Sequence, residues 1–174
     1  LSQEAVVQNP ANRCYYCKKV IFSEIQKKAL ELGFTCLADG TNASDDADDR
    51  PGMKALQEMK VLSPLRMCGY VKSEIRKQSK EAGLFVHNKP SYACLATRIP
   101  TGTEIDEEKI KQVETAEKFL LDLGFSDFRV RWMDNKAKIQ MPESQLQALM
   151  EKREVVLEEL SKIFDEVLLD LRTR

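Results

Sequence analysis

The chain has 174 residues, of which 27 are Lys or Arg and 28 are Asp or Glu, and its formal net charge is −1. This balance excludes a strongly basic nucleic-acid arm and a polyacidic tail. No apolar run approaches the roughly 18 residues of a membrane span, and residues 1–13 lack the apolar stretch of a signal peptide. The composition therefore predicts a cytoplasmic protein with one domain or two small ones.

The chain begins with Leu1 rather than Met, so we expect a fragment or a processed product. Its 5 cysteines are too few for a disulfide scaffold, and their number is odd. In a reducing cytoplasm, a close cysteine pair indicates metal or redox chemistry before a structural disulfide.

Several elements are predicted in the first half of the chain. Apolar spacing indicates a helix over residues 18–32. The apolar run 34–38 follows, and it predicts a buried parallel strand with Cys36 in the core. The remaining pattern predicts helices over 53–60 and 73–82, an extended piece over 61–65, and a long ordered loop over 84–103.

The second half has a different character. Its pattern predicts, in order, an amphipathic helix over 106–123, strands over 128–132 and 136–141, a helix over 142–163 and a strand over 167–171. The predicted fold class is therefore α/β, and the second half is a small α+β domain that begins near residue 104.

Cys14 and Cys17 are the sharpest local feature, because thiolates three positions apart at a helix start can face one ion. Three interpretations are open. In the first, the pair is a redox dithiol, although residues 1–13 show none of the strand that such a motif requires. In the second, the pair is half of a zinc site completed by His87 and Cys94. In the third, the pair binds an iron–sulfur cluster with Cys94 as the third ligand.

Two further segments are candidate sites. Asp39-Gly40-Thr41-Asn42 follows the predicted parallel strand, where α/β sheets bind ligands, although an ordinary turn explains it equally well. The acids at 45–49 could bind Mg²⁺ or simply be solvated. Arg129 and Arg131 alternate on a predicted strand, so both guanidinium groups share one face and suit a phosphate or carboxylate, or acidic partners within the sheet.

Taken together, these segments resemble the ATP-dependent sacrificial sulfur transferases that help build the nickel-pincer cofactor of lactate racemase, the LarE family. That family belongs to the PP-loop ATP pyrophosphatases. The motifs that carry the resemblance are Asn12-Arg13-Cys14-Tyr15-Tyr16-Cys17-Lys18, Asp39-Gly40-Thr41-Asn42, Asp49-Arg50-Pro51-Gly52, Ser63-Pro64-Leu65, Lys72-Ser73-Glu74-Ile75-Arg76 and Asn88-Lys89-Pro90-Ser91-Tyr92-Ala93-Cys94-Leu95-Ala96-Thr97-Arg98.

The resemblance implies that residues 1–98 are the remnant of an adenine nucleotide alpha hydrolase-like PP-loop domain and that 99–174 serve sulfur transfer and substrate. It implies ATP with Mg²⁺, and adenylation of a carboxylate on a pyridine dicarboxylate mononucleotide to give a thiocarboxylate. By position, the implied catalytic residues are Cys94, Thr97, Arg98, Arg129 and Arg131, and the implied cofactor-binding residues are Asp39, Gly40, Thr41, Asn42 and Glu117.

The family uses two sulfur sources. One subtype sacrifices a cysteine, which here corresponds to Ala93. The other resembles thiouridine-forming enzymes, in which three cysteines hold a 4Fe-4S cluster. Because Cys14, Cys17 and Cys94 are all present, we expect the cluster.

The resemblance also implies a downstream nickel-insertion protein and a homo-oligomer, with neither membrane nor nucleic acid as partner. The Ser-Gly-Gly-x-Asp-Ser that cradles ATP phosphates in the family does not occur in this sequence, so we expect the 174 residues alone to be inactive. Two alternatives are a zinc-stabilised binding module using Cys14, Cys17, His87 and Cys94, and a related PP-loop enzyme that thiolates tRNA, which the near-neutral charge disfavours.

Overall fold

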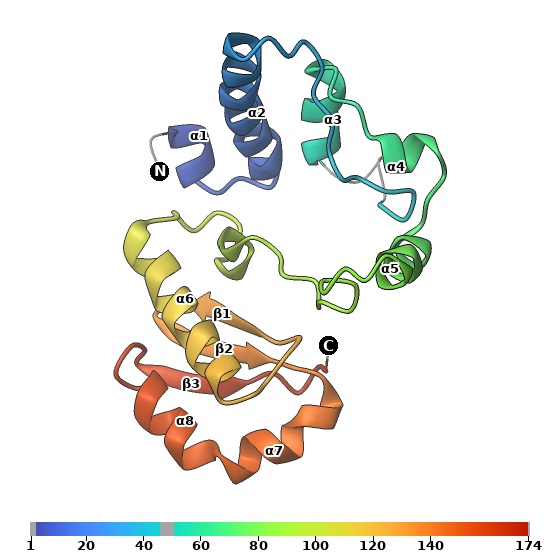
Figure 1. Ribbon diagram of the computed structural model, residues 1–174. Helices are drawn as coiled ribbons and strands as arrows, with labels where there is room; N and C mark the ends of the chain where they lie inside the picture. The colour runs from blue at the N-terminus through green and yellow to red at the C-terminus, as the bar shows by residue number, and fades with distance from the viewer. Residues whose placement is uncertain (1–2, 46–50, 174) are drawn as a thin grey trace. The chain divides into compact units, whose positions relative to one another are not determined.

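The computed structural model describes residues 3–45 and 51–173, which are mostly helical with a small mixed sheet (Figure 1). The chain divides into two compact units. The helical unit is Pro10–Lys89, and the sheet unit combines Leu1–Asn9 with Pro90–Arg174. The domains predicted over 1–98 and 99–174 stay a prediction. Among the described residues, no helix is both long and apolar enough to cross a membrane.

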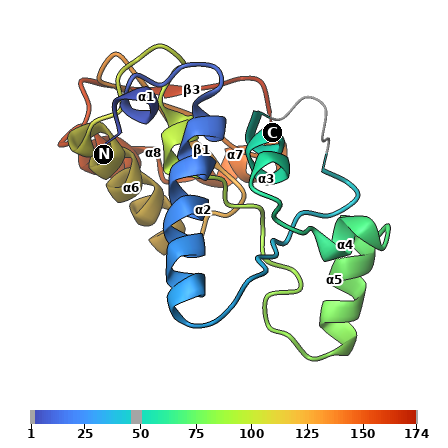
Figure 2. The same ribbon diagram turned by 90° about the horizontal axis from the view of Figure 1, so that it is seen from above.

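The helical unit contains four described helices, α2 (Arg13–Glu31), α3 (Pro51–Glu58), α4 (Pro64–Met67) and α5 (Lys72–Glu81). Helices α2 and α3 lie side by side (Figures 1 and 2). The helices predicted over 18–32, 53–60 and 73–82 are therefore confirmed, with α2 starting earlier than predicted. A small core joins them, made of Met53, Leu56 and Val61 with Phe22, Leu37 and Met59 against it.

The expected strand over 34–38 is reduced to a single parallel bridge between Ala38 and Leu62. The Asp39 amide donates to the Leu62 carbonyl at 2.8 Å, and the Leu62 amide donates to the Leu37 carbonyl at 2.9 Å. The parallel direction is as predicted, but the burial of Cys36 in the core was wrong, because its side chain is exposed. One bridge provides no sheet face that could cover it.

Helix α2 has the apolar stripe that its sequence predicts, yet it contains no buried residue. Ile21 and Ile25 are 49% and 45% exposed, and Leu32, which caps the end of the helix, is 63% exposed. Tertiary packing supplies most of the stability of a helix in a protein. This face of α2 therefore receives little of that support from the described residues.

The sheet unit contains a three-stranded sheet of order β1-β2-β3. Strands β1 (Arg129–Met133) and β2 (Lys136–Gln140) form an antiparallel hairpin, and β3 (Glu166–Leu169) runs parallel to β2. The other elements are α1 (Glu4–Val7), the 3₁₀ turns η1 (Leu95–Arg98) and η2 (Glu143–Gln145), and helices α6 (Glu107–Asp122), α7 (Leu146–Glu151) and α8 (Arg153–Leu160). The predicted α+β order is confirmed.

The prediction of one continuous helix over 142–163 is wrong, because that range contains three separate elements, η2, α7 and α8. Lys152 separates α7 from α8 with φ −100° and ψ 9°, outside the helical range. Its ammonium donates to the Leu123 carbonyl at 2.9 Å.

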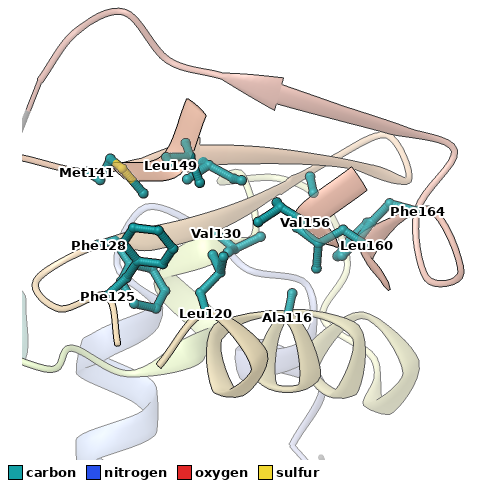
Figure 3. Close-up of a cluster of buried hydrophobic side chains, with 12 residues drawn as sticks. Ala116, Leu120, Phe125, Phe128, Val130, Met141, Leu149, Val156, Leu160 and Phe164 are labelled. Carbon is teal, nitrogen blue, oxygen red and sulfur yellow. The ribbon is translucent and has the colours of Figure 1, made fainter. Parts of the chain in front are cut away.

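The core of the sheet unit lies on one face of the sheet (Figure 3). Alternation places Val130, Ala137 and Ile139 on that face, each at most 2% exposed. They pack against residues of α6, α7 and α8, namely Ala116, Leu120, Leu149, Val156 and Leu160. The same alternation puts four polar residues on the other face of the sheet, namely Arg129, Arg131, Lys138 and Gln140.

Asn9 fixes the loop between η1 and α6. Its side chain is 1% exposed, and its amide donates to the Pro100 carbonyl at 2.7 Å. Its own carbonyl accepts from the Gly102 amide at 2.8 Å. Asn9 has a left-handed φ of 51°, which asparagine tolerates better than most residues. The loop that precedes α6 is therefore ordered.

Candidate functional site

A buried ion pair organises the sheet unit. Arg98, the last residue of η1, donates from Nε to Oε1 of Glu117 at 2.7 Å and from Nη2 to Oε2 at 3.1 Å. Both side chains are 1% exposed. Such a fork-to-fork pair is the strongest common geometry for an arginine and a carboxylate. Arg98 therefore acts as an internal anchor for η1.

Glu117 also connects α6 to the sheet. Its Oε1 accepts from the Val130 amide at 2.9 Å, in addition to the bond from Arg98. The Tyr92 ring lies 5.4 Å from the Arg98 guanidinium. Burial, the negative charge of Glu117 and a hydrogen bond to that carboxylate raise the pKa of Tyr92 to about 12. Glu117 is thus shared among η1, β1 and the segment before Cys94.

Cys94 is held at the start of η1, with an exposed thiol. Its carbonyl accepts from the Thr97 amide at 2.9 Å and from Thr97 Oγ1 at 2.7 Å. Arg98 Nη1 donates to Thr97 Oγ1 at 3.0 Å and to the Ala93 carbonyl at 3.4 Å. The thiol therefore projects from a segment whose backbone rests on the buried Arg98.

Arg131 reaches the same segment from β1. Its Nη1 donates to the Thr97 carbonyl at 3.0 Å, and its Nε donates to Gln140 Oε1. Arg129 lies on the same face of β1 and is half-buried. The structure thus brings five of the predicted site residues together, namely Cys94, Thr97, Arg98, Glu117 and Arg131.

A pocket of about 360 Å³ borders this segment. Arg98, Arg131, Trp132, Met133 and Gln140 are among its lining residues. Gln140 was not predicted from the sequence. The signal that could have found it is the β2 alternation, because Lys136, Lys138 and Gln140 are polar at every second position. The pocket offers guanidinium groups beside an aromatic ring and a thioether.

The cysteine pair lies in the first turns of α2, in the helical unit. Cys14 is exposed and Cys17 is half-buried. The guanidinium of Arg13 lies 3.9 Å from the Cys14 sulfur. Tyr15 and Lys19 both bond Glu58 of α3, at 2.8 and 2.9 Å. Tyr15, one of the two residues between the cysteines, is thereby tied to α3.

The Asp39 loop is also in the helical unit. Asp39 accepts from Thr41 Oγ1 at 2.5 Å and from Ser63 Oγ at 2.7 Å. Burial raises the pKa of Asp39, but these hydrogen bonds and the charge of Lys18 outweigh burial and lower it. A Cβ at Gly40 would meet no atom within 4 Å, so the backbone there is open to approach.

Asn42 closes the same loop. Its backbone amide and its Nδ2 donate to Asp45 Oδ2 at 3.1 and 2.9 Å. Of the acids proposed for Mg²⁺, Asp45 therefore has a defined role inside the loop. Asp46, Asp48 and Asp49 lie outside the described residues, as does Arg50 of the quoted motif.

The three cysteines predicted as metal ligands are divided between the units, with Cys14 and Cys17 in the helical unit and Cys94 in the sheet unit. His87 of the alternative zinc set belongs to the helical unit. Over residues 3–45 and 51–173, no group of three or more His, Cys, Asp or Glu side chains is placed to hold a metal ion. The metal roles of the three cysteines and the cofactor role of Glu117 stay predictions.

Comparisons with known proteins relate this chain to a family. No family model matches the chain. The chain is 34% identical over 146 residues to the pyridinium-3,5-bisthiocarboxylic acid mononucleotide synthase of Lactiplantibacillus plantarum, covering 84% of this chain and 53% of that protein. It is 40% identical over 156 residues to an uncharacterised protein of Synechocystis, covering 90% of this chain and 58% of that protein.

A more distant relative is a tRNA-specific 2-thiouridylase of Clostridium tetani, at 27% identity over 96% of this chain and 54% of that protein. The chain is therefore homologous to ATP-dependent sulfur transferases. More particularly, it is a homologue of the LarE family, to which the Lactiplantibacillus synthase belongs. It spans between 53% and 58% of the length of the first two relatives.

Proposed function

We propose that this chain is part of an ATP-dependent sulfur transferase that makes a thiocarboxylate on a pyridine dicarboxylate mononucleotide. The observation that carries the proposal is the similarity to the bisthiocarboxylic acid mononucleotide synthase over 84% of the chain. The product would serve nickel-pincer cofactor synthesis, with transfer to a nickel-insertion protein. A homo-oligomer is part of the same proposal.

The reaction needs two steps. A substrate carboxylate oxygen attacks the α-phosphorus of ATP, and pyrophosphate leaves. A sulfur nucleophile then attacks the acyl carbon, and AMP leaves with the electron pair of the broken C–O bond. Adenylation is required because an unactivated carboxylate has no leaving group that sulfur could displace.

The residues of the sheet unit have distinct roles in this proposal. Arg131 borders the pocket and binds an oxyanion of the substrate or of AMP. Thr97 and Arg98 hold the segment that presents Cys94. Arg129 adds a second positive charge on the same sheet face. In the helical unit, the Asp39–Asn42 loop contributes to binding the nucleotide.

For the sulfur source, we propose a 4Fe-4S cluster bound by Cys14, Cys17 and Cys94. Among the described residues, none of the three forms a disulfide, and the guanidinium of Arg13 lies 3.9 Å from the Cys14 sulfur. When bound, a cluster with three protein ligands supplies one iron that can carry an additional sulfide. The protein's own part is to supply the three sulfur ligands.

Anaerobic reconstitution with ferrous iron and sulfide tests this proposal. The loaded protein should absorb broadly near about 400 nm, as thiolate-bound iron does. Cys14→Ser, Cys17→Ser and Cys94→Ser should each lose iron. Cys36→Ser and Cys68→Ser are matched controls, since both cysteines are exposed and free, and they should retain it.

Two outcomes would overturn the cluster. Equal iron loss in the control serines would show non-specific binding. Zinc binding that disappears in His87→Ala would instead support the zinc-stabilised module.

The acceptor is tested separately, in the longer enzyme of which this chain is proposed to be part, with ATP and a pyridinium dicarboxylate mononucleotide. AMP release together with a mass change of one oxygen exchanged for sulfur supports the proposal. The relation to the Clostridium thiouridylase makes tRNA the necessary comparison. Thiolation of tRNA and not of the mononucleotide would overturn the proposed substrate.

A further inference from the structure

A chain of side-chain hydrogen bonds links the end of the sheet to the pocket. Gln140, the last residue of β2, accepts from Arg131 Nε through Oε1. Its Nε2 donates to Asp170 Oδ2 at 2.7 Å. Arg131 continues the chain by donating from Nη1 to the Thr97 carbonyl at 3.0 Å. Asp170, which follows β3, is thereby connected to the segment that carries Cys94.

The chemistry of the two outer groups fixes the orientation of the amide between them. A guanidinium can only donate hydrogen bonds, and an ionised carboxylate can only accept them. The Gln140 amide must therefore turn its oxygen to Arg131 and its nitrogen to Asp170. If Asp170 were lost, the amide could rotate, and Arg131 would lose its defined partner.

Asp170 is itself firmly held. Lys138 Nζ lies 3.0 Å from its Oδ2, and the Arg172 amide donates to its Oδ1 at 3.1 Å. Its side chain is 13% exposed. The hydrogen bonds from Gln140 and Lys138 lower the pKa of Asp170 to about 2, so it is an acceptor throughout the neutral range.

The side-chain amide of Gln140 is neutral, so its hydrogen bond does not neutralise the positive charge of Arg131. Over the described residues, the ion pairs of this region are Arg98 with Glu117 and Lys138 with Asp170, and neither includes Arg131. Arg98 lines the same pocket but is neutralised by Glu117. Arg131 is therefore the guanidinium whose charge remains available to an anion in the pocket.

We propose that Asp170 is a positioning residue that acts through Gln140 to aim Arg131 at an oxyanion, a phosphate or a carboxylate, in this pocket. The identity of that oxyanion as part of the mononucleotide or of AMP rests on the proposed function. The positioning itself does not rest on it.

Sulfate is a suitable probe, because its charge is constant over the neutral range. Trp132 lines the pocket and is the single tryptophan of the chain, so its fluorescence reports binding. Arg131→Ala should abolish the sulfate response. Asp170→Ala and Gln140→Leu should each weaken sulfate binding about tenfold, the usual effect of losing one hydrogen bond to a charged group.

The direction in which sulfate affinity changes on removing Asp170 separates positioning from simple electrostatics. Removing a carboxylate makes the region more positive, and Coulomb attraction alone would tighten sulfate binding. Asp165→Ala, a charge-matched control just before β3 in the same unit, should leave the affinity unchanged or slightly raised. Equal or tighter binding in Asp170→Ala would therefore overturn the proposal.

The double variant tests the route of action. If Asp170 acts through Gln140, Asp170→Ala combined with Gln140→Leu should bind no more weakly than either single variant. Fully additive losses would contradict this route. Circular dichroism and the Arg131 Nε–H NMR signal show whether each variant is folded and whether that bond is lost. Because sulfate is neither substrate nor product, these results stand whether or not thiocarboxylate synthesis is found.

Discussion

Arg98 Nε and Glu117 Oε1 lie 2.7 Å apart with both side chains 1% exposed, so a complete ion pair is buried within the sheet unit. The same Glu117 oxygen accepts the Val130 amide of β1. One carboxylate therefore connects the Cys94 segment, α6 and the sheet. Its removal should disturb all three together.

Glu117→Gln should lower the free energy of unfolding of the sheet unit by about 3–5 kcal/mol, the usual cost of breaking a buried ion pair from one side. The glutamine oxygen can still accept from Val130, so the loss reflects the uncompensated charge on Arg98. Urea unfolding followed by Trp132 fluorescence measures it. Glu114→Gln, an exposed glutamate on the same helix, is the matched control and should change little. Equal effects in the two variants would contradict an anchoring role for Glu117.

Tyr92 should titrate with a pKa of about 12, well above its usual 10.0. Burial and Glu117 both disfavour the phenolate, so Glu117→Gln should move the pKa back toward 10.0. The difference in tyrosinate absorbance between the native chain and Tyr92→Phe isolates this group.

The raised pKa of Tyr92 makes the stability of the folded chain depend on pH. The folded state holds the Tyr92 proton more tightly than the unfolded state does, so this contribution is complete below pH 10 and is lost between pH 10 and about 12. Over that interval the native chain should lose more stability than Tyr92→Phe. Parallel curves for the two proteins would show that the phenol does not interact with Glu117.

Local signals were sufficient for much of the sheet unit. Helix α6 was predicted to within a residue at each end, because Asp106 caps its start and Gly124, at φ 94°, follows its end. The β1–β2 turn was predicted from Asp134 and Asn135, which adopt left-handed φ values of 50° and 57°. In both cases the residue that sets the backbone conformation is next in sequence to the helix or strand, so a local pattern is sufficient to locate the boundary.

Features that depend on distant partners were not predictable in the same way. The strand expected over 34–38 needs a parallel neighbour, and Leu62 provides only one bridge. The resemblance placed Arg98 at the catalytic site, but its burial was not predictable, since its partner Glu117 lies 19 positions away. Gln140 and Asp170 are hydrogen-bonded across 30 positions, so the sequence around either residue does not indicate the contact.

The N-cap of α6 gives a further prediction. Asp106 Oδ1 accepts from the Lys109 amide at 2.7 Å. Asp106→Ala should cost about 1 kcal/mol of stability, because one amide at the helix start loses its acceptor. Asp106→Ser keeps a capping oxygen and should recover most of that loss. Thermal unfolding of the three proteins measures both changes, and an Asp106→Ser as unstable as Asp106→Ala would exclude capping as the cause.

Acid stability should depend on Asp170. Hydrogen bonds from Gln140 and Lys138 lower its pKa from the usual 3.8 to about 2, so the folded state prefers the ionised form. Its contribution is therefore complete above pH 3.8 and is lost as the pH falls from 3.8 to about 2, where the unfolded chain takes up the proton first. Asp170→Asn lacks this titration. Its stability should lie below that of the native chain at pH 5, and the gap should narrow steadily toward pH 2. A gap that stays constant from pH 5 to pH 2 would assign the loss to packing rather than to the ionised carboxylate, and it would remove the fixed acceptor on which the orientation of Gln140 depends.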